Sequence, residues 1–191
     1  MPDLIPGYRY EKMSRAELQP LIEPLRPSVF AKTGHLPAGY AYAEAEQEAL
    51  WRLEDNLSAR SVLAIGIFQG DACVGWHVGN QLDRGNFEMT SSGISTQHRR
   101  RGLYRALIPI VLEYARNEGF GAVVSRHNLT NNAVIIPKLR AGFVISGFEV
   151  DDRFGTLVQL KHIFNPLRRK VFDVRVGQRG LDDDTRVLFE A

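Results

Sequence analysis

The stretch that decides the fold reads Ile94-Ser95-Thr96-Gln97-His98-Arg99-Arg100-Arg101-Gly102-Leu103-Tyr104-Arg105. Residues 86–94 before the loop have the pattern of a strand. After it, apolar residues recur at three- and four-residue spacing, which predicts an amphipathic helix. The loop therefore lies at a helix N-terminus, where the first backbone N–H groups have no partner within the helix and the helix dipole is positive. Such a junction binds anions, and Gly102 allows a ligand to approach the backbone closely.

The sequence of the loop distinguishes between several classes of anion-binding site. A P-loop needs Gly-x-x-x-x-Gly-Lys-Ser/Thr and a Rossmann turn needs Gly-x-Gly-x-x-Gly, and neither string occurs in the chain. The loop instead resembles the Gln/Arg-x-x-Gly-x-Gly/Ala signature of the GCN5-related N-acetyltransferases (GNAT), with Arg99 first and Gly102 fourth. Tyr104 departs from this signature, because a small residue is usual at the last position. The resemblance implies that acetyl-CoA is bound along this segment, at Ile94, Ser95, Thr96, Arg99, Arg100, Arg101, Gly102, Leu103 and Tyr104.

A second segment supports the same family. Residues 125–135, followed by 138–144, are similar to the family's strand, Asn-x-x-Ala helix and closing Gly-Phe. Gly142 suits the position just after a helix. The resemblance implies that Asn128 and Asn131 hydrogen-bond the pantetheine arm of the coenzyme; both residue types also cap helices well. The likeness covers residues 60–163, and residues 164–191 do not align with the family.

The order of elements predicts the architecture. We expect strands at 8–13, 62–68, 72–79, 86–94, 122–125, 143–150 and 156–163, and helices at 15–25, at 42–57, from Leu103 onward and before Gly142. Antiparallel hairpins thus flank one β-α-β crossover, which predicts an α/β (α+β) fold with a mixed, mostly antiparallel sheet and helices on both faces. This order matches the GNAT architecture. Residues 1–163 would form the acetyltransferase domain.

The C-terminal extension, residues 164–191, has three possible interpretations. It adds an edge strand at 171–176, packs on a partner such as a second copy in a homodimer, or frays.

Composition limits the classes of protein. With 191 residues, 44% hydrophobic and 24% charged, the chain suits a single domain that buries roughly 70% of its unfolded surface. A net charge of +2 is too small to steer the molecule toward nucleic acid or an anionic membrane. The single cysteine, Cys73, excludes an internal disulfide, residues 1–6 do not resemble a signal peptide, and no apolar stretch approaches the ~20 residues of a membrane span. We expect a cytoplasmic protein, and the histidine spacing predicts no metal site.

Acetyl transfer to an amine needs a held thioester, a neutral amine and stabilisation of the developing oxyanion. The resemblance implies that the backbone N–H of Ile94 serves the oxyanion. A lysine-like amine of pKa ~10.4 is neutral only about once in two thousand molecules at pH 7, so a base helps. Glu88 precedes Arg99 at the spacing of the general-base glutamate in the histone-modifying branch of the family. Alternatively, ordered water is the base, and Glu88 is then only a residue of the strand that faces solvent.

The general acid is less clear from the sequence. Where the family often has a tyrosine that protonates the departing thiolate, this chain has Lys138. Lys138 could donate that proton, bind coenzyme phosphate, or be an ordinary lysine on a helix surface. Tyr104 and His127 are substitutes for the acid.

Three functions compete. The first is an N-acetyltransferase, a transferase of the acyltransferase class, that moves an acetyl group from acetyl-CoA to a primary amine of a small molecule or peptide. The second is a non-catalytic acyl-CoA-binding or regulatory module, which the missing tyrosine favours. The third is a nucleic-acid binder that uses residues 99–101 and 168–170 as phosphate clamps, but aromatic interleaving and a large positive charge are absent. The acidic helix at 42–57 is either a solvated face or an attraction for a cationic substrate.

Overall fold

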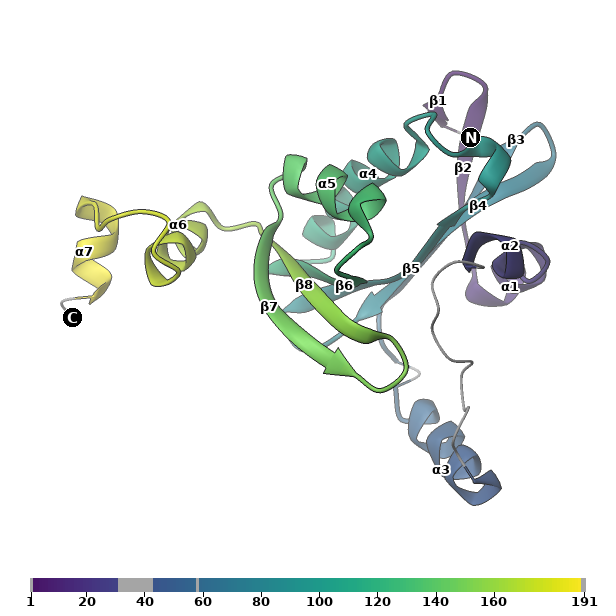
Figure 1. Ribbon diagram of the computed structural model, residues 1–191, viewed down its shortest axis with the longest axis horizontal. Coiled ribbons are helices and arrows are strands. Elements are labelled where there is room, and N and C mark those ends of the chain that lie inside the picture. Colours follow the sequence, from purple (N-terminus) through teal and green to yellow (C-terminus); the bar gives the residue numbers. More distant parts are fainter. Residues whose placement is uncertain (1, 31–42, 58, 190–191) are drawn as a thin grey trace.

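A computed structural model describes residues 2–30, 43–57 and 59–189. Within these residues, eight strands form one sheet in the order β1-β2-β3-β4-β5-β6-β8-β7 (Figure 1). The strands are β1 (Asp3–Ile5), β2 (Tyr8–Met13), β3 (Val62–Gln69), β4 (Ala72–Gln81), β5 (Asn86–Ile94), β6 (Ala122–Asn128), β7 (Val144–Asp151) and β8 (Gly155–Ile163). The helices are α1 (Arg15–Ile22), α2 (Arg26–Phe30), α3 (Glu44–Asp55), α4 (Leu103–Asn117), α5 (Asn132–Arg140), α6 (Pro166–Arg175) and α7 (Asp183–Phe189).

The central strands β5 and β6 separate along their length. They form the parallel pair of the described sheet, and they pair only where residues 86–88 lie beside residues 122–124. Both strands continue without pairing to each other, β5 to Ile94 and β6 to Asn128. We call residues 89–94 and 125–128 the splayed end of β5 and β6. Backbone N–H and C=O groups on the inner edges of a splayed end are available to a ligand.

A β-bulge explains why β5 bends away. Opposite Val78 and Gly79 of β4 stand Ser91 and Met89 of β5, so Thr90 is an extra residue in the register. A bulge bends the strand that carries it and increases its twist. The bend falls just after Glu88, the last residue of β5 that pairs with β6.

The two faces of the sheet carry separate apolar clusters. On the first face, which we call the α4 face, Leu107 and Val111 of α4 pack with Ile65, Phe87 and Val123 of the sheet, and α5 lies beside α4 (Figure 1). On the opposite face, the α1 face, α1 packs against β3 and β4. Its cluster contains Leu18, Ile22, Ala64, Trp76 and Val78. Because each helix presents one apolar stripe to the sheet, the helices fix the sheet between them.

The expected fold class is confirmed, and so are the bounds of the strands at 8–13 and 86–94. The helix expected at 15–25 is observed as α1, which ends earlier, at Ile22. The short helix α2, which was not predicted, begins at Arg26 with Pro27 in its first turn. The expected helix at 42–57 is observed as α3, although Tyr42 lies outside the described residues. The short strand β1 was not predicted.

Of the three interpretations of residues 164–191, the edge strand at 171–176 is wrong. Residues 166–175 form α6, since the Asn165 side chain caps the helix by accepting a hydrogen bond from the Arg168 N–H at 3.0 Å. Pro166 occupies the first turn, where its missing N–H costs nothing. α6 is tied to the turn between α5 and β7 through the Arg169 guanidinium, which donates to the Gly142 carbonyl at 2.8 Å. α6 and α7 extend from the side of the sheet that carries β7 (Figure 1).

A substitution at Gly93 tests the packing of the α1 face. A Cβ at this position would lie 2.3 Å from the Trp76 ring, which is fully buried and has no room to move. We expect Gly93→Ala to lower the free energy of unfolding by about 1–3 kcal/mol in urea titrations. The matched control is Gly85→Ala, because a Cβ on Gly85 meets nothing within 4 Å; its effect should stay within about 0.5 kcal/mol. Equal effects in the two variants would contradict this packing.

Candidate active site

The loop between β5 and α4 has the backbone of an anion site. After Ile94, a 3-10 turn (Thr96–His98) leads into Arg99, and Arg100 then adopts a left-handed conformation with φ of 61°. Gly102 is left-handed as well, with φ of 86°, and is the N-cap of α4. Left-handed residues in a turn bring N–H groups to one side, which forms a concave anion-binding surface.

The second half of this loop and the start of α4 have free backbone N–H groups within the described structure. No described residue accepts a hydrogen bond from the backbone N–H of residues 100–104. Further along α4, the Ala106 N–H donates to the Gly102 carbonyl at 3.0 Å, which starts the hydrogen bonding of the helix. These free donors begin a helix of 15 residues, so its dipole adds positive potential at the same place.

Side chains of the loop hold it in place. His98 Nδ1 is hydrogen-bonded to the Tyr8 hydroxyl at 3.0 Å. Arg99 donates from Nε to the Ile94 carbonyl at 3.0 Å and from Nη2 to the Val29 carbonyl at 2.9 Å. The guanidinium of Arg99 therefore connects the loop to α2, which leaves the main chain, with the exposed Arg100 and Arg101, to meet an anion.

Tyr104 turns inward, which explains why a bulky residue is tolerated at the last position of the motif. Its ring packs against the apolar cluster of the α4 face. Burial raises the pKa of the Tyr104 phenol well above its usual value. A phenol with so high a pKa gives up its proton reluctantly, which argues against Tyr104 as the general acid.

The backbone of Ile94 faces the splayed end. The Ser95 N–H donates to the Val74 carbonyl of β4 at 2.9 Å, and Ile94 stands opposite Gly75. Hydrogen-bonded and non-hydrogen-bonded pairs alternate along an antiparallel ladder. The Ile94 N–H therefore points away from β4, toward the side where β6 no longer pairs.

Glu88 lies on the α1 face at the start of the splay. Its neighbours Phe87 and Met89 belong to the cluster of the α4 face, so its side chain points the other way. Glu88 is 6% exposed, and its Oε1 accepts from Arg126 Nε at 3.0 Å and lies 2.9 Å from Nη2. The same guanidinium reaches Glu149 at 3.2 Å. Burial alone would lower the pKa of Arg126, but Glu88 and Glu149 raise it.

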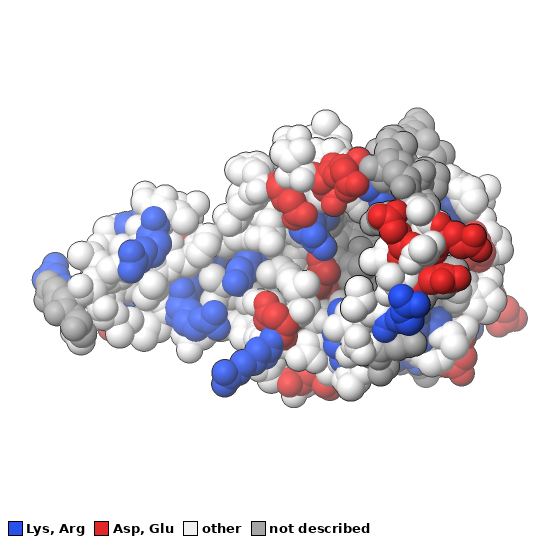
Figure 2. All heavy atoms as spheres, turned by 90° about the horizontal axis from the view of Figure 1, so that it is seen from below, with Lys and Arg blue, Asp and Glu red and all other residues white. Residues whose placement is uncertain are grey.

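Acidic side chains surround a hollow on this side of the molecule. Figure 2 shows acidic residues on both sides of the hollow. The β7–β8 hairpin carries Glu149, Asp151 and Asp152, and α3 carries the exposed Glu44, Glu46 and Glu48. Such a surface attracts cations from solution.

Lys138 is fully buried, so its interpretation as a helix-surface lysine is wrong. It comes from α5 on the α4 face, and its Nζ has no hydrogen-bond partner in the described structure. Nζ lies 5.2 Å from the centre of the Phe143 ring. Burial lowers the pKa of Lys138 well below its usual value, and Glu88 acts weakly in the opposite direction. Burial thus disfavours the charged ammonium form of Lys138 relative to the neutral amine.

Two histidines lie within electrostatic range of Lys138. His77 on β4 is fully buried; its Nδ1 is hydrogen-bonded to Ser92 Oγ at 2.9 Å, whereas its Nε2 has no partner among the described residues. His127 Nε2 is hydrogen-bonded to Ser125 Oγ at 3.1 Å. Burial first, and then the charge of Lys138, lower the pKa of each histidine to about 3. Neither histidine is a charged imidazolium at neutral pH, which argues against His127 as the acid.

These histidines make the fold sensitive to acid. Each has a pKa of about 3 when folded and 6.5 as a free side chain, so the unfolded chain binds protons that the folded chain refuses. Stability should therefore be full above pH 6.5 and fall as the pH drops toward 3, by up to ~1.4 kcal/mol per pH unit for each histidine. Urea titrations at several pH values measure this slope. It should become shallower in the His77→Gln, His127→Gln double variant, and an unchanged slope would contradict the assignment.

Asn128 and Asn131 lie in the turn between β6 and α5. The Asn128 side chain accepts from the Thr130 N–H at 3.1 Å and from the Thr130 hydroxyl at 2.7 Å, so it shapes the turn. Asn131 is the N-cap residue of α5, but its side chain makes no capping hydrogen bond. The amide of Asn131 is thus open to a ligand.

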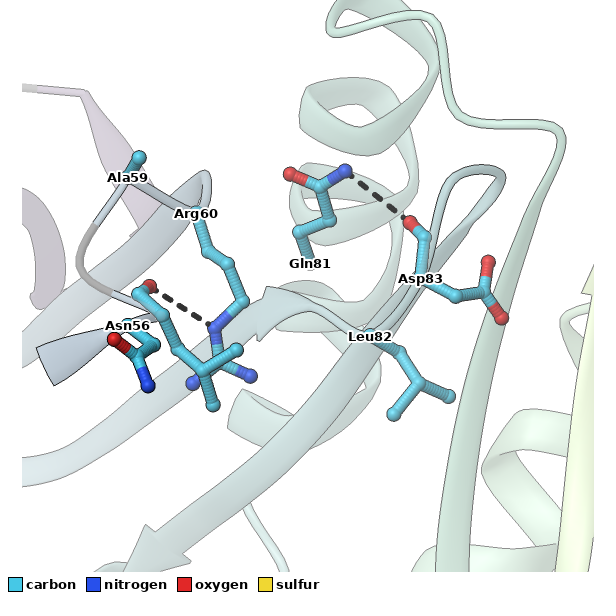
Figure 3. A pocket seen from close by; sticks show the side chains of 7 residues that line it. Asn56, Ala59, Arg60, Gln81, Leu82 and Asp83 are labelled. Atoms are coloured by element: carbon cyan, nitrogen blue, oxygen red, sulfur yellow. Dashed lines mark hydrogen bonds between the residues drawn. The ribbon is translucent and has the colours of Figure 1, made fainter. Parts of the chain in front are cut away.

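The described residues form a cavity near α3 and a groove between α4 and α5. One cavity of about 240 Å³ lies between the end of α3 and the β4–β5 turn, lined by Asn56, Leu57, Ala59, Arg60, Gln81, Leu82 and Asp83. Its polar groups bond locally: Gln81 donates to the Asp83 carbonyl at 3.2 Å and Arg60 to the Leu57 carbonyl at 3.2 Å (Figure 3). A larger groove of about 540 Å³ runs between α4 and α5, and Pro109 and Pro137 both line it.

The described part of the chain lacks two kinds of feature. Residues 2–30, 43–57 and 59–189 contain no group of three or more histidine, cysteine or acidic side chains placed to hold a metal ion. In the same residues no helix combines the length and the hydropathy that crossing a bilayer requires.

The fold of this chain is similar to that of several solved structures described as acetyltransferases. The chain is similar to yncA from Salmonella typhimurium, solved with its cofactor acetyl-CoA, at 15% identity and a TM-score of 0.61, covering 84% of this chain and 95% of that one. It is similar to the ribosomal-protein-S18-alanine N-acetyltransferase of Escherichia coli at 13% identity and a TM-score of 0.60, covering 83% and 94%. It is also similar to a variant of the spermidine N-acetyltransferase SpeG of Vibrio cholerae at 14% identity and a TM-score of 0.60, covering 83% and 95%.

At these identities the structural likeness shows the fold, and the family comes from the sequence. No curated protein is similar enough in sequence to count as a relative. The model of the Acetyltransferase (GNAT) family matches residues 30–143, which include the loop, Glu88, the splayed end and Lys138. The chain therefore belongs to the GNAT family of acetyltransferases.

Proposed function

We propose that the protein transfers the acetyl group of acetyl-CoA to a primary amine by direct attack, with the pyrophosphate held by the main chain of residues 100–104. The observation that carries the proposal is the row of free N–H groups at the start of α4, next to the splayed end. Each charge-assisted hydrogen bond from such a group to a phosphate oxygen contributes ~1.5–3 kcal/mol. Ser95 and Thr96 continue the same edge from the loop to β5.

The splayed end would receive the pantetheine arm and the thioester. Asn128 and Asn131 stand where β6 gives way to α5 and have amides suited to that arm. The Ile94 N–H points into the same space, so it is suited to stabilise the negative charge that develops on the thioester oxygen.

The acceptor amine would approach from the α1 face. The acidic surroundings of the hollow favour a cationic amine there (Figure 2). Glu88 lies at the inner end, and its Oε2 is not hydrogen-bonded to any described residue. We assign to Glu88 the removal of the ammonium proton, directly or through water, and to Arg126 the positioning of its carboxylate.

Lys138 occupies the opposite side of the splay and would handle the proton that the thiolate sulfur requires. After the acceptor amine has attacked, Lys138 in its neutral form would take the remaining extra proton from the acceptor nitrogen and pass it to the sulfur, so Lys138 would act as a relay. The two proton carriers thus lie on opposite faces of the sheet, Glu88 with the acceptor and Lys138 with the coenzyme. Residues 1–163 would form the acetyltransferase domain, with 164–191 as an extension.

The role of Glu88 is tested by Glu88→Gln. We expect kcat to fall about tenfold with little change in acetyl-CoA affinity, because water in the hollow replaces part of the base. Steady-state release of CoA thiol measures kcat, and calorimetry measures affinity. The control is Glu149→Gln, which removes the other carboxylate of Arg126 and should retain most of the activity. A Glu88→Gln enzyme with unchanged kcat across the pH range would assign the base to another group or to water.

A non-catalytic acyl-CoA-binding module is the second candidate, favoured by the Glu88–Arg126 ion pair and by Lys138 in place of the family's tyrosine. Incubation with acetyl-CoA and a panel of amines, with thiol release as the signal, separates the two. Release that depends on one class of amine supports the enzyme. Coenzyme binding without release for any amine supports the module.

A further inference from the structure

Lys138, which stands where the family often has a tyrosine, has unusual surroundings for a lysine. It is fully buried, and its Nζ donates to no described group. A buried amine without a partner is unfavourable, because it loses its hydration and gains nothing in exchange. His77 Nε2 is also buried and without a partner in the described structure, and it interacts electrostatically with Lys138. Two such groups in one place indicate a space that a polar ligand completes.

The surroundings identify that space as the coenzyme side of the splay. His77 is hydrogen-bonded to Ser92 of β5, and His127 to Ser125 of β6, so side chains of both splayed strands meet there. Both histidines interact electrostatically with Lys138 of α5. A thioester between β5 and β6 would therefore lie next to a nucleophilic nitrogen that does not belong to the substrate.

We infer that Lys138 is acetylated by the protein's own bound acetyl-CoA when no acceptor amine is present, and that this modification stops turnover. The inference rests on the proposed function. The lone pair of Nζ attacks the thioester carbonyl carbon, the C–N bond forms as the C–S bond breaks, and one N–H proton passes to the sulfur. The products are an acetylated lysine and the free thiol of CoA.

The modification would be self-limiting. An amide nitrogen has no available lone pair, so acetylated Lys138 no longer carries a proton to the sulfur. The added acetyl group also occupies the space of the thioester. An acceptor amine on the α1 face competes for the same carbonyl carbon, so substrate protects the enzyme.

The burial of Lys138 permits a sharp test by peptide mass spectrometry. The protein is incubated at pH 7 with acetyl-CoA and, separately, with a small acetylating reagent that lacks the CoA carrier. Lys12 is the internal reference, because it is an exposed lysine on β2. With acetyl-CoA we expect Lys138 to be acetylated at least about tenfold faster than Lys12, since the bound thioester reacts as if within one molecule. With the small reagent, the preference should reverse.

Variants and competitors complete the experiment. Lys138→Arg should lose the label, Lys12→Arg should retain it at Lys138, and excess free CoA should suppress it. Preincubation with acetyl-CoA alone should cause a time-dependent loss of acetyl transfer in step with the label. Absence of acetyl-Lys138 while coenzyme binds and an acceptor is acetylated would overturn the inference and leave the proposed function intact. Equal labelling by the two reagents would also overturn it. Absence of coenzyme binding and of transfer to any amine would refute the proposed function itself.

Discussion

Gly102→Asp is expected to lower the affinity for acetyl-CoA at least about a hundredfold, which corresponds to ~2.7 kcal/mol. Two effects act in the same direction. The φ of 86° at Gly102 is unfavourable for a residue with a Cβ, and the carboxylate would place a negative charge among the N–H groups that bind phosphate. Calorimetry with acetyl-CoA measures the change.

The matched control is Gly102→Asn, which has nearly the same shape without the charge and tolerates the left-handed conformation. Nothing lies within 4 Å of a Cβ at position 102, so the amide side chain fits. We expect the Asn variant to bind within about tenfold of the natural chain. Two variants with equal affinities would show that charge at this loop does not matter, which contradicts an anion site there.

Lys138→Met is expected to lower kcat about a hundredfold while leaving acetyl-CoA affinity nearly unchanged. Stability should stay the same or increase, because an apolar side chain replaces a fully buried amine that has no partner. The opposite directions of the two effects matter, since a residue with only a structural role would lose stability and activity together.

Thiol-release kinetics and urea titrations measure the two quantities on the same preparation. The control is Lys161→Met, which removes a half-buried lysine from β8 and should leave kcat within about threefold. A Lys138→Met enzyme with natural kcat would remove Lys138 from the mechanism. A loss of several kcal/mol in unfolding free energy would show that the amine stabilises the fold instead.

The loop and its helix could be predicted from the sequence because their signals are local. The apolar spacing after Leu103 marks α4, and the motif from Arg99 to Gly102 marks the turn that precedes it. The strand at 86–94 was predicted with its exact bounds for the same reason. Backbone roles such as that of the Ile94 N–H depend on strand order and register, which the family resemblance supplied.

The side chains of the site could not be predicted, because they depend on contacts between distant segments. The Glu88–Arg126 pair joins β5 to β6, and Arg99 reaches the Val29 carbonyl. Lysine is rarely buried without a partner, so the sequence favoured an exposed Lys138. In the tail, Asn165 and Pro166 are a local helix start signal, which favours α6 over an edge strand at 171–176.

The central claim is that main-chain N–H groups at the start of α4 hold the pyrophosphate of acetyl-CoA. The most direct test follows the backbone amide resonances of residues 100–104 by NMR during titration with acetyl-CoA. We predict that the amides of Gly102, Leu103 and Tyr104 shift together and saturate at the affinity measured by calorimetry. Saturable binding that leaves these amide resonances unmoved would contradict the account.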